Sequence, residues 1–204
     1  MNTPAKSAAW SARIPRVLAP LLLLVGCASA NAGWELDSER SSVQFLSVKN
    51  AMIAELHHFK SLTGGVNDEG VAQVVIDLDS VETLIPIRNE RLRKMLFETI
   101  QFPAATLQVE VPDTLGGLAA GETSQLTLPV AVEFHGKSKS YNAQLQATKL
   151  ADGSLEVSVL EPLVVYADDF DLGGGILALK EIAGLTSIST AVPVTARLRF
   201  NPEG

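Results

Sequence analysis

The sequence predicts an all-β protein, an eight-stranded antiparallel barrel with one or two short flanking helices. Three observations support this prediction. Apolar and polar residues alternate with a period of two in about eight segments, turn-forming residues separate these segments, and only two stretches have the spacing of a helix. Eight strands close a small barrel that can hold one ligand. A single domain is expected, because no linker or internal repeat divides the segments.

The alternation is clearest in the segments that end at Phe134 and Phe200. Such alternation predicts strands with one apolar face and one wet face. Asp152-Gly153, between two alternating segments, is the sharpest hairpin signal in the chain. The apolar positions of the two clearest segments are Leu126, Leu128, Val130, Val132 and Phe134, and Val192, Val194, Ala196, Leu198 and Phe200. Other alternating runs lie within residues 42–48, 74–78, 107–111, 141–147 and 155–159.

Two stretches break the period of two and predict helices. In residues 87–97, apolar residues stand near helical spacing and Glu90 precedes Lys94 by four positions. Residues 175–185 predict a second short helix that ends at Gly184. Both stretches lie between strands, so we expect them to cap or flank the barrel.

Residues 1–30 have the organisation of a secretory signal peptide. Lys6, Arg13 and Arg16 precede the apolar run 17–25, and small residues follow it. The run is about half of the roughly 20 residues that a membrane-spanning helix requires. We therefore expect a processed signal, an exported, periplasmic protein and a barrel domain over residues 34–202.

Two cleavage sites compete in this segment. Small residues at positions 28–32 favour ordinary cleavage near residues 30–33, whereas Leu24-Val25-Gly26-Cys27 resembles a lipobox cleaved between residues 26 and 27. We favour the lipobox, because it directly follows the apolar run. An acylated Cys27 would attach the protein to the outer or inner membrane. Cys27 is the only cysteine, so an intramolecular disulfide is excluded.

The charge balance argues against nucleic acid as a partner. The chain has a net charge of −7, and without the three basic residues of the signal 13 basic residues face 23 acidic ones, a net −10. Binding to phosphate backbones needs clustered Lys and Arg. The same acidity argues against electrostatic docking on anionic lipid.

The residues give no positive case for catalysis or metal binding. There is no G-x-S-x-G motif and no pair of carboxylates stands out as general acid and base, so no catalytic residue is assigned. His57 and His58 are neighbours on a predicted strand and point to opposite faces, which disfavours a shared ion. His135 lies in a predicted hairpin turn. No metal site is therefore expected.

The barrel interior has two interpretations, and both stay open. The expected inward residues are mostly Val, Leu and Ala, which can leave a ligand cavity or simply pack against one another. The basic residues at positions 88–94 likewise could bind a phosphate head group or form a solvated helix face paired with Glu90 and Glu98. We favour the solvated face, and Arg88 and Arg91 stay as head-group candidates.

Four segments together resemble the YceI-like family of exported lipid-binding proteins, and the resemblance covers nearly all of residues 34–200. The segments are WELDSERSSVQF (34–45), HHFKSLTGGVN (57–67), IRNERLRKMLFETIQFPAATLQV (87–109) and LTLPVAVEFHGKSKSYNAQLQA (126–147). Late in the chain, Asp169-Phe170-Asp171 stands where many members have Asp-Phe-Gly. The resemblance implies a lipocalin-like barrel that holds a polyisoprenoid, a quinone tail or a fatty-acid-like chain, with no catalytic residues and no cofactor besides such a ligand.

We expect the lipid tail to be held by desolvation rather than by directed polar bonds. The residues expected to line it are Phe45, Phe59, Phe97, Phe102, Leu128, Val130 and Phe134. Two rival functions stay open: an envelope lipoprotein that acts through protein contacts with a packed, ligand-free barrel, and a lipid-modifying enzyme on a barrel scaffold. A homodimer and a membrane quinone enzyme are left open as partners.

Overall fold

The computed structural model describes Met1 and residues 33–203. The predicted signal peptide, its cleavage sites and Cys27 lie outside the described residues. Within residues 33–203, no helix is long and apolar enough to cross a membrane. The strands are β1 (Trp34–Leu36), β2 (Ser42–Lys49), β3 (Ile53–Phe59), β4 (Leu62–Val66), β5 (Val71–Asp77), β6 (Val81–Glu82), β7 (Ala104–Glu110), β8 (Thr123–Phe134), β9 (Lys137–Lys149), β10 (Leu155–Val159), β11 (Leu163–Tyr166) and β12 (Ala191–Pro202).

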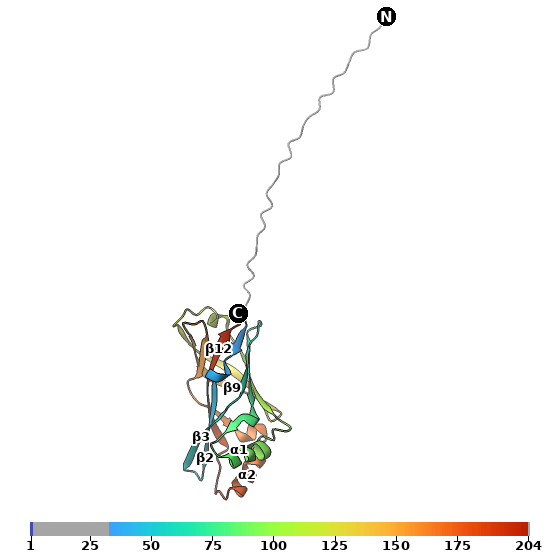
Figure 1. Cartoon of the computed structure of the whole chain (residues 1–204), viewed down its shortest axis with the longest axis vertical. Helices are drawn as coiled ribbons and strands as arrows, with labels where there is room; N and C mark the ends of the chain where they lie inside the picture. Colours follow the sequence, from blue (N-terminus) through green and yellow to red (C-terminus); the bar gives the residue numbers. More distant parts are fainter. Residues whose placement is uncertain (2–32, 204) are drawn as a thin grey trace. The chain divides into compact units, whose positions relative to one another are not determined.

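These strands form one closed antiparallel barrel, as the sequence predicts (Figure 1). The barrel has eight staves, where a stave is one position in the ring, occupied either by one strand or by two shorter strands in line. Four staves are interrupted, so that β1 and β2, β3 and β4, β5 and β6, and β10 and β11 are each two halves of one stave. The staves follow one another in sequence order. Pairing of β1 and β2 with the last strand, β12, closes the ring.

Local side-chain hydrogen bonds produce the interruptions in the first and third staves. A short 3-10 helix, η1 (Ser38–Arg40), separates β1 from β2, and Asp37 caps it by accepting a hydrogen bond from the Arg40 amide at 3.1 Å. A second one, η2 (Leu78–Ser80), separates β5 from β6, and Asp77 accepts from the Asp79 amide at 2.9 Å. Asp and Ser residues favour such caps over continued strand pairing. The staves therefore bend at these points.

Two hairpin turns follow from residues that adopt positive φ. His135 and Gly136, with φ of 50° and 71°, join β8 to β9, the longest strand pair of the barrel. Two consecutive residues at positive φ match the twist of a tight hairpin. The predicted Asp152-Gly153 turn between β9 and β10 is confirmed, with Gly153 at φ 86°.

Both predicted helices are present between strands, near the same end of the barrel (Figure 1). The first is α1 (Pro86–Arg91), continued by one turn of π-helix, η3 (Leu92–Leu96). The second is α2 (Gly173–Ile182), and Gly184 ends it at φ 63°, as predicted. A β-carbon at Gly175 would lie 2.6 Å from the Met95 carbonyl oxygen, so a glycine is what lets α2 approach η3 closely. The other 3-10 turns are η4 (Asp113–Leu115) and η5 (Ala167–Phe170).

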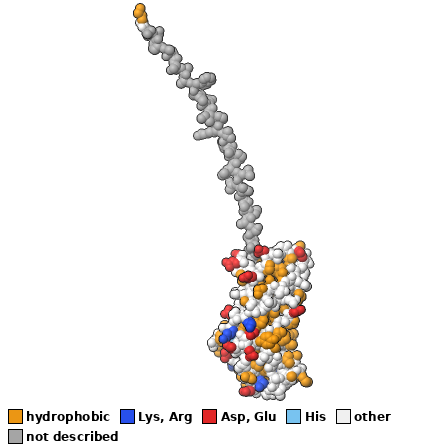
Figure 2. Space-filling model, turned by 180° about the vertical axis from the view of Figure 1, so that it is seen from behind, with side chains coloured by type: hydrophobic (Ala, Val, Ile, Leu, Met, Phe, Trp, Pro, Cys, Tyr) orange, Lys and Arg blue, Asp and Glu red, His pale blue; other side chains and the backbone are white. Residues whose placement is uncertain are grey.

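The outer surface near α1 is less polar than is expected for a solvent-exposed strand face. Met52, Leu56, Leu84 and Ile87 are all more than half exposed. The contact between Arg88 of α1 and Glu55 of β3 brings these segments together. Figure 2 shows apolar side chains spread over one face of the barrel, with charged side chains interspersed.

We expect Gly64→Ala to destabilise the barrel. A β-carbon at Gly64 would lie 2.0 Å from the Gln73 carbonyl oxygen on the paired strand β5, and its φ of 142° is unfavourable for other residues. The free energy of unfolding, measured by denaturant titration, should fall by about 2 kcal/mol or more. Gly174→Ala is the matched control, because nothing lies within 4 Å of its β-carbon position, and it should leave stability unchanged or raise it slightly. Equal stability of both variants would contradict this account.

Candidate ligand-binding cavity

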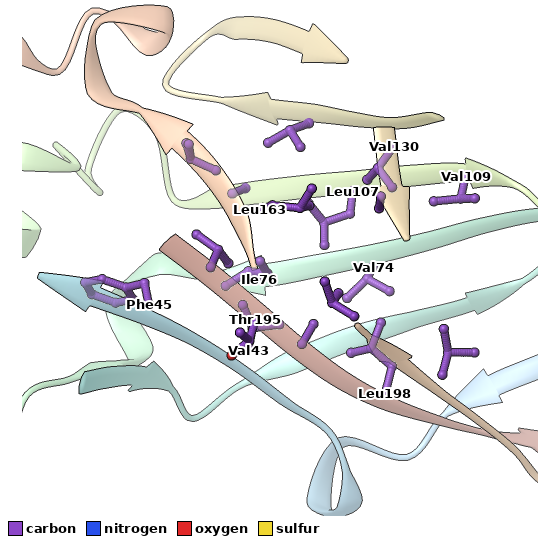
Figure 3. Close-up of a pocket in the computed structure, with 18 of the residues that line it drawn as sticks. Val43, Phe45, Val74, Ile76, Leu107, Val109, Val130, Leu163, Thr195 and Leu198 are labelled. Carbon is purple, nitrogen blue, oxygen red and sulfur yellow. The ribbon is translucent and has the colours of Figure 1, made fainter. Parts of the chain in front are cut away.

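An apolar cavity of about 270 Å³ lies inside the barrel. All eight staves contribute side chains to its wall, together with η3 and α2 near one end. Every lining residue except Thr195 is apolar. Figure 3 shows labelled side chains from opposite walls, among them Leu107, Val130, Val74 and Leu198, pointing toward a common space. Such a wall offers a ligand almost no directed polar bonds, so it suits an apolar chain.

The period of two places these side chains inside. All five apolar positions of the β8 run and all five of the β12 run line the cavity. The neighbouring residues on β8 point outward, as the exposure of Thr127 and Glu133 shows. Small residues keep the space open on β9, where Ala143 is fully buried and lines the wall without filling it.

Six of the seven residues expected to line the ligand lie on the cavity wall: Phe45, Phe59, Phe97, Leu128, Val130 and Phe134. Their four aromatic rings form a chain that Phe170 extends. The ring centroids lie 5.4 Å apart for Phe45 and Phe59, 6.1 Å for Phe59 and Phe97, 5.8 Å for Phe97 and Phe134, and 5.4 Å for Phe134 and Phe170. This spacing is typical of packed aromatic pairs. Residues distant in sequence therefore build one continuous aromatic wall.

Phe102 does not line the cavity, contrary to expectation. It lies in the segment between η3 and β7, where the strand alternation does not yet apply. Its ring packs on the turn between β8 and β9, with its centroid 4.3 Å from that of His135. His135 is in turn held by Phe170 and Glu98, since its Nδ1 lies 3.1 Å from the Phe170 carbonyl oxygen and its Nε2 lies 3.1 Å from Glu98 Oε2. Phe102 thus fixes a turn rather than the cavity.

The basic residues of the first helix only partly form the predicted solvated face. Lys94 pairs with Glu90 at 2.6 Å, as expected for that face. Arg88 instead turns toward the barrel, where its Nη1 donates to Glu55 at 2.7 Å and its Nη2 to the Thr83 carbonyl oxygen at 2.6 Å. Arg91 is partly buried and makes no ion pair with the described residues.

Arg88 belongs to a group of polar side chains that sequence reasoning missed, here called the polar cluster. It comprises Ser47, Lys49, Glu55, His57 and Arg88. Glu55 accepts from Lys49 at 2.6 Å as well as from Arg88, and both contacts lower the pKa of its carboxyl, Lys49 most strongly. Ser47 Oγ lies 2.9 Å from His57 Nε2. The sequence pattern that could have revealed part of this cluster is the alternation of Ile53, Glu55, His57 and Phe59. It puts Glu55 and His57 on the same strand face as Phe59.

His57 is held neutral inside this cluster. Its side chain is only 3% exposed, and burial lowers its pKa to about 4, with the nearby positive charge of Arg88 acting in the same direction. His58 points the other way and is less buried, so the prediction of opposite faces is confirmed. Among residues 33–203, no three His, Cys, Asp or Glu side chains are placed to hold a metal ion together.

The YceI-like domain family model matches residues 34–200. The chain belongs to this family. A solved polyisoprenoid binding domain from Saccharophagus degradans, described as implicated in plant cell wall breakdown, is 37% identical to it with a TM-score of 0.82, over 84% of this chain and 99% of that domain. BcnA of Burkholderia cenocepacia is 18% identical with a TM-score of 0.60, over 80% of this chain and 98% of BcnA, and shows the fold alone. A comparison with curated protein sequences found no match.

The buried His57 should make this YceI-like protein lose stability as the pH falls. The folded pKa of about 4 lies below the ordinary 6.5, so the unfolded chain binds the proton first. The contribution of His57 to the free energy of unfolding is complete above pH 6.5 and is lost as the pH falls toward 4. The loss reaches about 2 kcal/mol at pH 5.

Denaturant unfolding at pH 7 and pH 5 measures this loss against a variant. His57→Gln should remove the His57 share of the pH dependence, whereas His58→Gln should keep it, because His57 is then still present. An unchanged difference between the two pH values in His57→Gln would show that His57 is not the group responsible.

Proposed function

We propose that this YceI-like protein binds an isoprenoid-type lipid inside its barrel and carries or stores it without chemical change. The observation that carries the proposal is the cavity inside the barrel, whose wall is apolar at every position but Thr195. The 37% identity to a domain described as polyisoprenoid binding supports the choice of ligand class. A polyprenyl chain, a quinone tail and a fatty-acid-like chain all have the required apolar surface.

Desolvation alone can supply the affinity that such a function needs. Micromolar binding corresponds to about −8 kcal/mol, and association costs roughly 4 to 15 kcal/mol in lost freedom. At about 25 cal/mol per Å² of buried apolar surface, roughly 500 to 900 Å² would offset both. A tail of several isoprene units presents an area of this order. The aromatic wall of Phe45, Phe59, Phe97 and Phe134 gives it a rigid surface to pack against.

The proposed setting is the periplasm, with the protein exported by the signal in residues 1–30. Acylation of Cys27 would hold the barrel at a membrane, which is where a water-insoluble lipid is collected and released. The resemblance of residues 24–27 to a lipobox supports this part of the proposal.

Mass spectrometry of organic extracts tests the proposal directly, on protein purified gently from the cell envelope without detergent. A polyprenyl, quinone or acyl species at a stoichiometric amount is the expected result, and it would name the ligand. An empty protein that also takes up no added isoprenoid would overturn the proposal in favour of a lipoprotein that acts through protein contacts. Conversion of an added lipid to a new chemical species would favour the alternative of a lipid-modifying enzyme on a barrel scaffold.

Leu128→Arg should abolish lipid retention. Leu128 lines the cavity, and a guanidinium there would be desolvated by the bound tail without a partner. Lipid content should fall to background while the far-UV circular dichroism stays β-rich. Thr127→Arg is the matched control, since the neighbouring side chain is exposed on the outer face and should retain lipid. Retention by Leu128→Arg equal to that of the control would count against this cavity as the binding site.

A further inference from the structure

The inner face of the β2–β3 hairpin changes from aromatic to polar along its length. Successive side chains of a strand alternate, so residues two apart share a face. On β2 that face continues from Phe45 of the cavity wall to Ser47 and Lys49. On β3, paired with it, the face runs from Phe59 to His57 and Glu55, with Phe45 opposite His57 and Ser47 opposite Glu55. In Figure 3, Phe45 stands at one extremity of the labelled side chains, and the polar cluster follows it along the inner face of β2 and β3.

The polar cluster touches the aromatic wall directly. The His57 ring centroid lies 5.2 Å from that of Phe45, which itself packs on Phe59. Arg88 reaches the cluster from α1 and joins it through Glu55. The side chains of Lys49, Glu55 and Arg88 are between 23% and 28% exposed. The cluster is therefore shielded, but it is not sealed from a ligand.

Donors outnumber acceptors in the polar cluster. Glu55 is its single carboxylate, and both cations contact it through the same oxygen, Oε2. Two buried nitrogens, His57 Nδ1 and Arg88 Nε, have no hydrogen-bond partner among residues 33–203. Lys49 Nζ carries three donors and makes one ion pair, to Glu55. A buried donor left without a partner is rare in folded proteins, so Arg88 Nε, together with the remaining donors of Lys49, calls for a ligand that accepts hydrogen bonds.

The charges limit what that ligand can be. Two cations and one carboxylate leave a net charge of +1 when His57 is neutral. A neutral carbonyl or a single carboxylate is compatible with this sum. A diphosphate carries a larger negative charge that the cluster would leave uncompensated in a partly desolvated place.

We propose that the polar cluster binds the head group of the lipid, and that this head group is an oxygen acceptor with at most one negative charge, either a carbonyl or a carboxylate. The inference rests on the proposed function, because it needs a lipid tail in the adjoining cavity. Lys49 and Arg88 donate to the acceptor oxygen, and Glu55, which both cations contact, competes with it for their donors.

Ligands that share one tail but differ in head group separate the contribution of the head group to the affinity from that of the tail. Geranylgeranoic acid, its methyl ester, geranylgeranyl diphosphate and the corresponding C20 hydrocarbon share the same chain. Their affinities for protein produced from the full chain are measured by titration in one buffer. The acid or the ester should bind at least about tenfold more tightly than the hydrocarbon, as one hydrogen bond to a charged donor provides. The affinity of the methyl ester distinguishes a site for a neutral carbonyl from a site for a carboxylate, because the ester keeps the carbonyl and carries no charge.

Two substitutions with opposite expected effects distinguish a binding role from a structural one. Lys49→Met should weaken binding of geranylgeranoic acid about tenfold and leave the hydrocarbon unchanged. Glu55→Gln removes the competing carboxylate and should strengthen binding of the acid. A cluster that only stabilises the fold would never give tighter binding on losing its central acid. Arg197→Met is the control, because Arg197 pairs with Glu156 on the outer face at 2.8 Å.

The outcomes separate the inference from the proposed function on which it rests. Equal affinity for all four ligands, unchanged in Lys49→Met, would overturn the head-group site and leave tail binding standing. Tightest binding of the diphosphate would overturn the limit of one charge. Binding of none of the four would overturn the proposed function, and the head-group site with it.

Discussion

Closure of the barrel is the constraint on which the remaining structure depends. Pairing of β12 with β1 and β2 leaves the staves without a free edge and creates an enclosed inner face. Strand alternation then turns every second residue toward that face, and along the cavity those residues are mostly Val, Leu, Ile, Ala and Phe. These side chains leave part of the interior unfilled, as the apolar cavity of about 270 Å³ shows.

The two helical segments near one end depend on the same closure. The α1 and η3 segments and α2 pack on each other where Gly175 permits close approach, and Leu96 and Ile176 from them complete the cavity wall. Arg88 couples this layer to β3 through Glu55. The polar cluster therefore lies at the end where α1 packs, while the apolar wall extends along the barrel. This arrangement of a polar cluster beside a long apolar wall fits a ligand with a long apolar tail and a small polar head.

Most strand positions, the inward faces of β8 and β12 and both helices could be predicted because each depends on local periodicity. Turn chemistry at Asp152-Gly153 and the helix end at Gly184 are equally local, since a positive φ favours glycine wherever the chain must turn. Phe102 could not be placed in this way, because it lies between a helix and a strand, where neither period applies. Hydrophobicity alone assigned it to the cavity, and packing on His135 decided otherwise.

The sequence by itself determined the number of staves, the residues that face inward and the apolar character of the interior, because these follow from the order of neighbouring residues. Tertiary structure decided which distant groups meet. It joined Phe45, Phe59, Phe97 and Phe134 into one wall, with Phe170 packed against Phe134, and it turned Arg88 from a surface cation into a partner of Glu55. The contact between Arg88 and Glu55 spans 33 positions of the chain. No local pattern encodes such a pairing, because it exists only once the closed barrel holds β3 against α1.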